Sequence, residues 1–380
     1  MPKILFFITE DWAFLSHRLP LARACRDAGW QVVIATHVTN RAEFIRGEGF
    51  DLEPLPLDRG GKNPWREARA LVALLRVLRR QKPDILHCVA VKPVLYGNLA
   101  ARLLGHERTV SALAGMGYAF TGGSATVRLL RGFLSLLLRG LLRRAGHRVI
   151  VQNEDDRDLL LAIGATTESD VTLIPGSGVD LAALPALAPP ASAPVIFALV
   201  ARMLADKGVR EAVGAMRILK EQGVAAELWL VGAPDPHNPS TIDEAELLRW
   251  QGEGVARWLG HKSDIKPIWE QAHVAILPSY REGMPKALLE AAACARPIIT
   301  TDVVGCRQVI DDGIEGFKVP ARESAPLAAA MRRLAEDPAL RLRMGLAARE
   351  RAEKLFGQER VVEAHMAIYR SLLDAAPCAE

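Results

Sequence analysis

Short apolar runs rich in β-branched residues alternate along the chain with longer stretches whose apolar residues recur at helical spacing. The short runs predict strands at Ile4–Ile8, Val32–Thr36, Asp84–Cys88, Arg148–Val151, Val195–Ala201, Glu227–Val231, Val274–Leu277 and Pro297–Thr300. The stretches between them predict helices, for example at Leu19–Ala28, Ala68–Arg79 and Val209–Lys220. Such alternation is typical of parallel sheets with helices on both faces, so we expect an α/β fold.

The alternation restarts after Leu181–Pro194, a stretch rich in proline and alanine that is typical of a linker. A chain of 380 residues exceeds what one hydrophobic core usually serves. We therefore expect two tandem Rossmann-like, doubly wound domains at residues 1–180 and 195–357, with a helical tail at 358–380. Ligands of open α/β sheets bind beyond the carboxyl ends of the strands, so two facing domains predict an interdomain cleft.

Composition narrows the class of protein. Half of the residues are apolar and a quarter are charged, which excludes a disordered chain. The five cysteines are scattered without a Cys-x-x-Cys pair, so we expect neither a disulfide scaffold nor a zinc ribbon, and a reducing cytosol fits best. We find neither a signal-peptide pattern nor a run of about 20 apolar residues. A net charge of +4 is too weak to argue for a nucleic-acid partner.

The polar loop after the apolar run Val274–Leu277 carries the first candidate site. Pro285 fits the first position of a helix, because its missing amide hydrogen would be unpaired there anyway, so we expect a helix to begin at about Pro285. The amides of Gly283, Met284 and Lys286 would then lie at the positive end of that helix, where phosphate or sugar oxygens bind favourably.

Two carboxylates bracket the start of this helix. Glu282 can accept hydrogen bonds from sugar hydroxyls, and Glu290, about one and a half turns into the helix, can reach a ribose. The plain alternative is that Glu290 is a surface carboxylate paired with Lys286. The lysine-before-glutamate order is the weaker orientation of such pairs, and the neighbours of Glu290 are almost all apolar or small, which favours a specific partner.

A second constellation follows the predicted strand Val195–Ala201. Arg202 and Lys207 would both project at its carboxyl end, on the same rim as Glu282. A departing diphosphate needs compensation for its negative charge, which paired cations or a metal can provide. The acidic run Glu154–Asp156 opens a predicted helix and is better explained as a charged cap, so we expect no metal and no cofactor. Ordinary solvated side chains remain the alternative for both cations.

Together these residues resemble family 4 retaining glycosyltransferases of the GT-B fold, and the resemblance covers nearly the whole chain. It is carried by the spacing Glu282-x7-Glu290 within Tyr280–Ala291, by the upstream Arg202 and Lys207, and by the following Gly305–Ile310.

The resemblance implies a nucleoside diphosphate sugar as donor, and we expect UDP as its nucleotide. The residues expected to act in catalysis are Arg202 and Lys207, on the diphosphate, and Glu282, on the donor sugar. The residues expected to bind the nucleotide sugar are Glu290, on the ribose, with Gly283, Met284, Pro285 and Lys286. The resemblance also implies that the tail from Gln358 crosses back to the first domain.

Transfer would keep the anomeric configuration. Family chemistry is described as a front-face substitution in which the departing phosphate oxygen accepts the acceptor's proton, so no protein nucleophile is required. This account fits the chain, in which we find no compelling Ser/His/Asp or Cys/His arrangement.

The candidates for acceptor contact lie in the first domain. Many family members carry a histidine in the loop after the fourth N-terminal strand, but here the loop Ser111–Tyr118 has none; its glycines, Gly115 and Gly117, can bring the main chain close to a ligand or form a simple turn. The loop after the first strand offers His17, at a helix start, and Arg18. His87 and Lys92 are predicted to follow a strand in the same way. A structural role is the alternative for each histidine.

From Thr126 to Arg148 the chain carries six arginines and no acid among leucine, phenylalanine and valine residues. At about 100° per residue, four of the arginines share roughly one third of the helix circumference: Arg128, Arg131, Arg139 and Arg143. Such a helix can lie on an anionic cytoplasmic leaflet, although a core helix with a solvated basic stripe is equally compatible with the pattern.

A lipid-linked acceptor would agree with the subgroup that three segments resemble, namely bacterial enzymes that extend polyprenyl-diphosphate-linked oligosaccharides for surface glycans. These segments are His17–Pro20, Gly115–Thr121 and Pro175–Asp180. The sequence therefore predicts a glycosyltransferase at the inner face of the cytoplasmic membrane. A sugar-nucleotide epimerase of the same fold and a non-catalytic sugar-nucleotide-binding subunit remain as alternatives. A dehydrogenase is disfavoured, because no Gly-x-Gly-x-x-Gly follows Ile4–Ile8.

Overall fold

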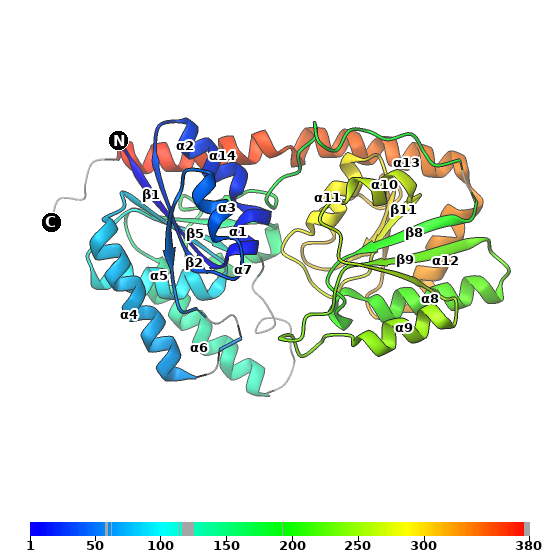
Figure 1. Ribbon diagram of the computed structural model, residues 1–380, viewed down its shortest axis with the longest axis horizontal. Coiled ribbons are helices and arrows are strands. Elements are labelled where there is room, and N and C mark those ends of the chain that lie inside the picture. Colours follow the sequence, from blue (N-terminus) through cyan, green and yellow to red (C-terminus); the bar gives the residue numbers. More distant parts are fainter. Residues whose placement is uncertain (58–59, 62, 114, 116–124, 192, 376–380) are drawn as a thin grey trace. The chain divides into compact units, whose positions relative to one another are not determined.

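The computed structural model describes residues 1–57, 60–61, 63–113, 115, 125–191 and 193–375. The chain divides into two compact units (Figure 1). The first comprises Met1–Ser177 with Glu359–Glu380, and the second comprises Gly178–Gln358.

The first unit is built on a parallel sheet of seven strands in the described chain, ordered β3-β2-β1-β4-β5-β6-β7. The strands are β1 (Lys3–Glu10), β2 (Gln31–His37), β3 (Asp51–Pro54), β4 (Ile85–Val89), β5 (Thr109–Leu113), β6 (His147–Val151) and β7 (Val171–Leu173). Side chains alternate between the two faces of a strand. Both faces of β1 are therefore apolar and buried, as a sheet covered by helices on both sides requires.

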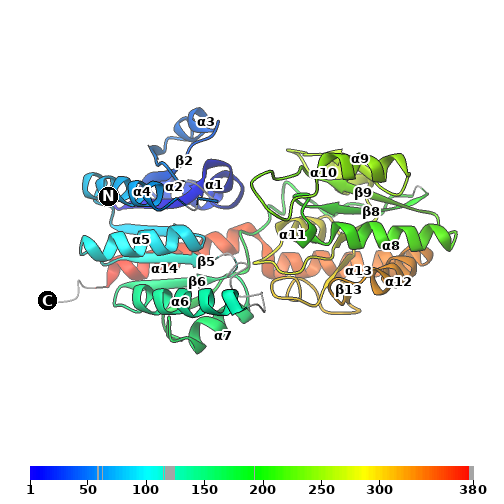
Figure 2. The ribbon, with the colours of Figure 1, turned by 90° about the horizontal axis from the view of Figure 1, so that it is seen from below.

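Helices cover the two faces of this sheet as separate groups (Figures 1 and 2). One face carries α4 (Pro64–Gln81), α5 (Val91–Leu103), α6 (Ala125–Leu142) and α7 (Glu154–Ala162), packed on a core that includes Leu5 and Phe7. The other face carries α1 (Asp11–His17), α2 (Leu19–Asp27), α3 (Ala42–Gly47) and α14 (Gln358–Asp374), packed on Ile4 and Phe6.

The second unit repeats the arrangement on a parallel sheet of six strands within the described residues, ordered β10-β9-β8-β11-β12-β13. Its strands are β8 (Val195–Val200), β9 (Ala226–Val231), β10 (Arg257–Gly260), β11 (Val274–Leu277), β12 (Ile298–Thr301) and β13 (Gly316–Val319). Its helical segments are η2 (Ala205–Lys207), α8 (Val209–Glu221), α9 (Glu244–Gly252), α10 (Lys266–Gln271), α11 (Lys286–Ala293), α12 (Ser324–Glu336), α13 (Pro338–Arg351) and η3 (Ala352–Phe356).

The predicted α/β class with two doubly wound sheets is confirmed, and each predicted strand overlaps a strand of the structure. One local prediction is wrong, since residues Ser111–Leu113 belong to the buried strand β5 rather than to a loop. The helix after β11 begins at Lys286, next to the predicted start at about Pro285, with Pro285 as its N-cap instead of its first residue. The Pro285 carbonyl accepts from the amide of Leu288 at 3.0 Å.

The stretch Leu181–Pro194 forms no helix or strand in its described residues. It lies against the second unit, because the buried Arg296 donates to the carbonyl oxygens of Leu187 and Ala188, the latter at 2.9 Å. The tail helix α14 packs in the first unit, where Tyr369 is fully buried.

Candidate functional site

The candidate donor residues gather at one edge of the second sheet. Strands β8, β11 and β12 are parallel neighbours, so the loops that follow them leave the sheet at the same edge. Two backbone hydrogen bonds join these loops to one another. The Tyr280 amide donates to the Asp206 carbonyl at 2.9 Å, and the Glu282 amide donates to the Val304 carbonyl at 3.0 Å. The loop between β11 and α11 is therefore held from both sides.

Two glycines allow this close approach. Gly208 has φ +71°, and a Cβ atom there would lie 2.1 Å from the Pro278 carbonyl oxygen. Gly305 has φ +80°, and a Cβ atom there would lie 2.4 Å from the Glu282 carbonyl oxygen. Real Cβ atoms are not found at such distances from backbone atoms, so both positions require glycine to keep the loop in place.

Gly208 can be tested against Gly223, which has nearly the same φ, +70°, but nothing within 4 Å of a built Cβ. Gly223→Ala should cost about 1–2 kcal/mol of unfolding free energy from backbone strain alone. Gly208→Ala causes the same backbone strain and must also displace Pro278. We therefore expect it to lower the free energy of unfolding by clearly more, about 3 kcal/mol or above. Urea unfolding of both variants measures the difference, and equal losses would refute close packing at Gly208.

Lys207 and Glu282 form an ion pair in which the Lys207 ammonium donates to Glu282 Oε1. The Ser279 hydroxyl donates to the same oxygen at 2.8 Å. Both charged side chains are mostly buried, so the pair is poorly screened by solvent. An ammonium has three hydrogens. Lys207 can thus donate to a ligand while Glu282 holds it in position.

The partner of Arg202 was missed by the sequence prediction. Arg202 pairs with Asp235, whose other oxygen accepts from the His237 amide at 3.2 Å. The Asp235 amide donates to the Thr241 hydroxyl at 2.9 Å, which fixes the carboxylate further. A signal was present, since Asp235 closely follows the predicted strand Glu227–Val231, where ligand-binding side chains of an α/β sheet gather.

Glu290 shows features of both interpretations offered by the sequence. Its carboxylate lies 3.7 Å from the Lys286 ammonium, the i, i+4 pairing that the plain alternative requires. Its side chain is nevertheless only 16% exposed. Burial raises the pKa of Glu290 above its ordinary 4.5, and the nearby Lys286 ammonium opposes the shift. A mostly buried carboxylate of this kind gains from a ligand that donates hydrogen bonds to it.

A cluster beside the loop was also missed. The Tyr280 hydroxyl donates to Glu211 Oε1 at 2.6 Å, and the Arg322 guanidinium lies 4.0 Å above the Tyr280 ring. Burial, together with the bond to Glu211, raises the pKa of Tyr280 to about 12, so the phenol stays protonated and can donate. Nothing in the sequence joins these residues, because α8 and the loop after β13 bring them together from distant positions.

In the first unit, His17 and Arg18 lie at the junction of α1 and α2. His17 is the last residue of α1, not at a helix start as predicted, and its Nδ1 lies 3.3 Å from the Ser177 hydroxyl. Arg18 is 2% exposed, with its guanidinium donating to the His17 carbonyl at 3.0 Å. Of the two side chains, only that of His17 reaches the surface.

His87 lies inside β4, not after it as predicted. It is fully buried, its ring bonds the Tyr369 hydroxyl, and it stacks on His365 with ring centroids 5.9 Å apart. Burial, with Arg18 and His365 nearby, holds the pKa of His87 well below its ordinary value, so the ring stays neutral. The position of His87 is that of a packing residue beneath α14.

The other candidates of this unit lie beyond the strands. Lys92 is the second residue of α5, and its ammonium donates to Glu67 Oε1 at 2.8 Å. Gly115 follows β5 with φ +89°, a conformation that favours glycine. Gly117 lies outside the described residues. Within the described chain, no group of three or more His, Cys, Asp and Glu side chains could hold a metal ion.

Two family models match the chain. The one described as "Glycosyl transferase 4-like" matches residues 3–153, and the one described as "Glycosyl transferases group 1" matches residues 194–337. The two matches together span more than half of the sequence.

Two curated proteins are similar over most of the chain. One is the N,N'-diacetylbacillosaminyl-diphospho-undecaprenol alpha-1,3-N-acetylgalactosaminyltransferase of Campylobacter jejuni, 25% identical over 89% of this chain and 91% of the relative. The other is the UDP-Gal:alpha-D-GlcNAc-diphosphoundecaprenol alpha-1,3-galactosyltransferase of Escherichia coli, 23% identical over 73% of each chain. Among solved structures, sucrose-phosphate synthase of Thermosynechococcus elongatus matches with a TM-score of 0.80 at 21% identity, covering 99% of this chain and 100% of that one. This last likeness shows a shared fold.

Proposed function

The chain belongs to the 4-like and group 1 glycosyltransferases, which have the GT-B fold, and we propose that it transfers a sugar from a UDP-sugar to a saccharide linked to a polyprenyl diphosphate. The names of the two curated relatives, which act on undecaprenol-diphosphate-linked sugars, support this acceptor class. The product would serve bacterial surface polysaccharide or glycan assembly. The donor name of the Escherichia coli relative supports UDP.

The single observation that carries the proposal is the Lys207–Glu282 pair at the carboxyl edge of the second sheet. Lys207, with Arg202, would compensate the negative charge that develops on the diphosphate, since each cation is held in place by a carboxylate. Glu282 would accept hydrogen bonds from the donor sugar, and Glu290 from the ribose hydroxyls.

Gly283, Met284, Pro285 and Lys286 would line the nucleotide sugar at the start of α11. This helix spans Lys286–Ala293, and its N-terminal amides carry partial positive charge that favours phosphate oxygens.

The reaction balances without a covalent enzyme intermediate. The bond between the anomeric carbon and the β-phosphate oxygen breaks, and a bond from the acceptor oxygen to the same face of that carbon forms. The acceptor proton passes to the departing phosphate oxygen, so UDP leaves with the electron pair and the anomeric configuration is retained. The protein's part is to orient the donor and to stabilise the leaving charge.

For the acceptor we propose groups of the first unit. His17, Lys92, Gly115 and Gly117 remain candidates, of which the first three lie among the described residues and are at least partly exposed. Buried Arg18 and His87 would act only through the residues that they support.

No helix in the described part of the chain is long and apolar enough to span a membrane. We propose a peripheral place at the inner face of the cytoplasmic membrane, where a lipid-linked acceptor is reached. The basic residues of the α6 region, Arg128, Arg131, Arg139 and Arg143, would lie against anionic lipid there.

A thermal-shift screen of UDP-, GDP- and ADP-sugars tests the donor class. Binding to the folded state alone raises the melting temperature as the site fills, so we expect a clear rise with a UDP-sugar and little with the others. A larger rise with GDP- or ADP-sugars would reassign the nucleotide, and no rise with any of them would remove the basis of the proposal.

Two further outcomes separate the alternatives. An epimerase would convert the donor sugar without any acceptor, and chromatography of the nucleotide sugars after incubation would detect the product; neither curated relative is an epimerase. A non-catalytic binding subunit would be stabilised by the UDP-sugar but would release no UDP with any membrane-lipid acceptor.

A further inference from the structure

Three helices form a continuous outer layer on one face of the first sheet. α4 packs against α5, and α5 packs against α6, so the three lie side by side (Figure 2). Their inward residues enter one core, through Leu74 of α4, Val94 of α5 and Leu138 of α6. The outward sides of the three helices therefore belong to one surface, which we term the α4–α6 layer (residues 64–81, 91–103 and 125–142).

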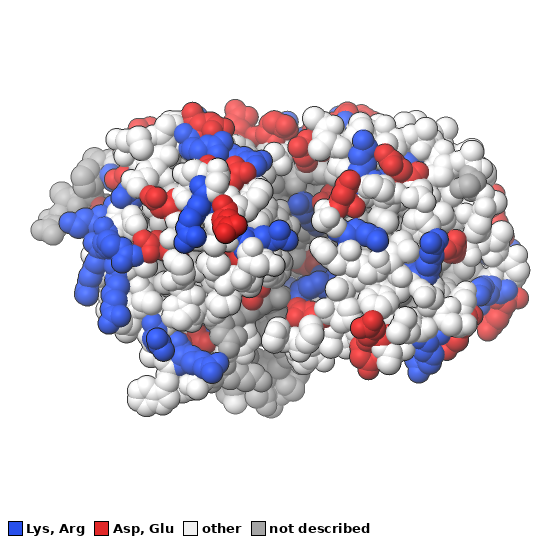
Figure 3. Space-filling view, in the orientation of Figure 1, with Lys and Arg blue, Asp and Glu red and all other residues white. Residues whose placement is uncertain are grey.

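The charges of the α4–α6 layer are almost all positive. Glu67 is the single acidic residue within the three helices, and it is mostly buried, accepting from Lys92 at 2.8 Å and from the Tyr96 hydroxyl. The exposed basic residues are Arg66, Arg69, Arg76, Arg79, Arg80, Arg102, Arg128 and Arg139. Figure 3 shows basic side chains grouped where Figure 1 places α4.

Large apolar side chains stand among these arginines instead of being covered. Trp65 at the start of α4 is 85% exposed, and on α6 Leu129, Phe133 and Leu136 are 77%, 61% and 69% exposed. The three α6 residues follow one another at i, i+4 and i+7, which places them along one side of the helix. On α5, Leu103 is 62% exposed. A basic helix face that is merely solvated has no use for exposed large apolar side chains, so their presence favours an interaction surface.

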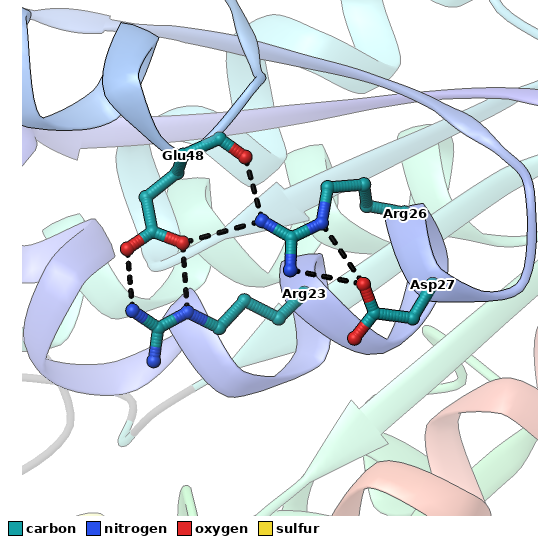
Figure 4. A network of polar contacts seen from close by, with 4 residues as sticks. All are labelled: Arg23, Arg26, Asp27 and Glu48. Atoms are coloured by element: carbon teal, nitrogen blue, oxygen red, sulfur yellow. Dashed lines mark hydrogen bonds and ion pairs between the residues drawn. The ribbon is translucent and has the colours of Figure 1, made fainter.

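The helix α2, on the opposite face of the same sheet, is different. On α2, Arg23 and Arg26 both pair with Glu48, and Arg26 also pairs with Asp27 at 2.9 Å (Figure 4). Their charge is neutralised within the protein. On the α4–α6 layer, Arg66, Arg69 and Arg76 form no ion pair with any described residue. Their charge is therefore available to an anionic partner outside the chain.

We infer that the α4–α6 layer is a docking face for an anionic lipid bilayer, with Trp65, Leu129, Phe133 and Leu136 entering the interface and the arginines contacting lipid phosphates. Trp is favoured at the headgroup level, where its ring is apolar and its N–H is polar. Arginine with exposed leucine and phenylalanine is typical of surfaces that lie in this region. The inference deepens the proposed function, on which it rests for the membrane-linked acceptor, and extends the contact from α6 to α4 and α5.

Flotation of the full-length protein with vesicles tests the inference. We expect binding to phosphatidylcholine vesicles that contain phosphatidylglycerol, and much weaker binding to phosphatidylcholine alone. The triple variant Arg66→Glu, Arg69→Glu and Arg76→Glu should lower the apparent affinity at least 100-fold, since each arginine near an anionic surface is worth about fivefold and reversal costs more. The triple variant Leu129→Ser, Phe133→Ser and Leu136→Ser should also abolish binding, and Trp65→Ser should weaken it.

The matched control reverses three exposed arginines elsewhere, with the same change of net charge: Arg343→Glu, Arg360→Glu and Arg370→Glu. It should keep most of the vesicle binding. Equal losses in the control and in the α4 variant would show an effect of net charge alone and overturn the inference. Unchanged flotation of the α4 and α6 variants would also overturn the inference. So would a wild-type protein that self-associates without binding vesicles, if light scattering showed that the variants lose this self-association.

Stabilisation by a UDP-sugar, measured on the same variants, keeps the two ideas apart. All variants should keep the wild-type thermal shift, because the donor residues lie in the second unit. Vesicle binding without any UDP-sugar shift in the wild type would contradict the proposed function and leave the docking face standing. A rise in melting temperature with UDP-sugar but no vesicle binding would contradict the docking face and leave the proposed donor class standing.

Discussion

Replacing Lys207 with alanine is expected to lower kcat by about 10²- to 10³-fold, with a smaller change in the KM for the donor. The Lys207 ammonium is mostly buried and held by Glu282, so it is oriented before the donor binds. Charge on the diphosphate grows as the sugar bond breaks, so the loss should fall chiefly on the transition state. Initial rates over a range of UDP-sugar concentrations measure kcat and KM separately.

A structural explanation of this loss can be separated from a catalytic one. Lys207→Ala leaves the Glu282 carboxylate mostly buried without its cation, which alone can disturb the loop. The double variant Lys207→Ala with Glu282→Gln removes that unpaired charge. If the double variant regained wild-type turnover, Lys207 would only neutralise Glu282. The control Lys354→Ala, an exposed helix-surface lysine paired with Glu350, should leave kcat unchanged.

Replacing Glu290 with glutamine is expected to weaken donor binding by about 10- to 100-fold while changing kcat little. A ribose hydroxyl donates to a carboxylate more strongly than to an amide, and this carboxylate is only 16% exposed. Calorimetric titration with UDP measures the affinity directly. The control is Glu350→Gln, which alters an exposed carboxylate that also pairs with a lysine four residues away, here in the glutamate-before-lysine order. Equal affinities of both variants would remove Glu290 from the site.

The pH dependence provides a second test of Glu290. Burial raises the pKa of its carboxyl above 4.5, so it takes up a proton on acidification before an ordinary glutamate does. UDP affinity of the wild type should fall as the pH falls toward this raised pKa, and Glu290→Gln should flatten the dependence. The linkage to folding has the opposite sign. Because folding favours the protonated Glu290, this group adds to the free energy of unfolding at low pH. Its contribution is fully present below pH 4.5 and is lost as the pH rises through the raised pKa.

Most of the central strands of both sheets could be predicted because their residues are apolar on both faces. β1, β8 and β11 are nearly continuous buried runs. The exception is β5 (Thr-Val-Ser-Ala-Leu), an internal and fully buried strand whose polar residues hid it, so that Ser111 onward was predicted as a loop. The strands without a prediction include β3 (Asp-Leu-Glu-Pro) and β10 (Arg-Trp-Leu-Gly), at the edges of their sheets, where residues stay partly exposed. Their extended conformation depends on a neighbouring strand, which no local pattern records.

The candidate site was predictable as far as it follows chain order. Lys207 and Glu282 each come shortly after an apolar strand, and parallel strands place such loops at one edge. Their partners were not predictable in the same way. Asp235 carried the same signal, because it follows the neighbouring strand β9, but nothing marked it as the partner of Arg202. Arg322 reaches Tyr280 from beyond β13, which chain order does not indicate. Only the packed structure joins these residues.

His87 was predicted to be an acceptor contact but is a buried packing residue. The predicted strand Asp84–Cys88 spans it, yet the acceptor hypothesis placed it after the strand, and the sequence did not indicate which face of the strand would be covered. The helix α14, from the far end of the sequence, buries His87 through Tyr369 and His365. A histidine that could have met the acceptor is thereby enclosed in the core of the first unit.

The most direct test of the account follows a labelled sugar from UDP-sugar into lipid. Purified protein is incubated with the labelled donor and a polyprenyl-diphosphate-linked saccharide, and the organic extract is counted and analysed by NMR. The account predicts one added sugar in the lipid fraction, bound with the anomeric configuration that it had in the donor, and an equal amount of free UDP. An inverted linkage, or label recovered only as free sugar or as an epimerised nucleotide sugar, would contradict it.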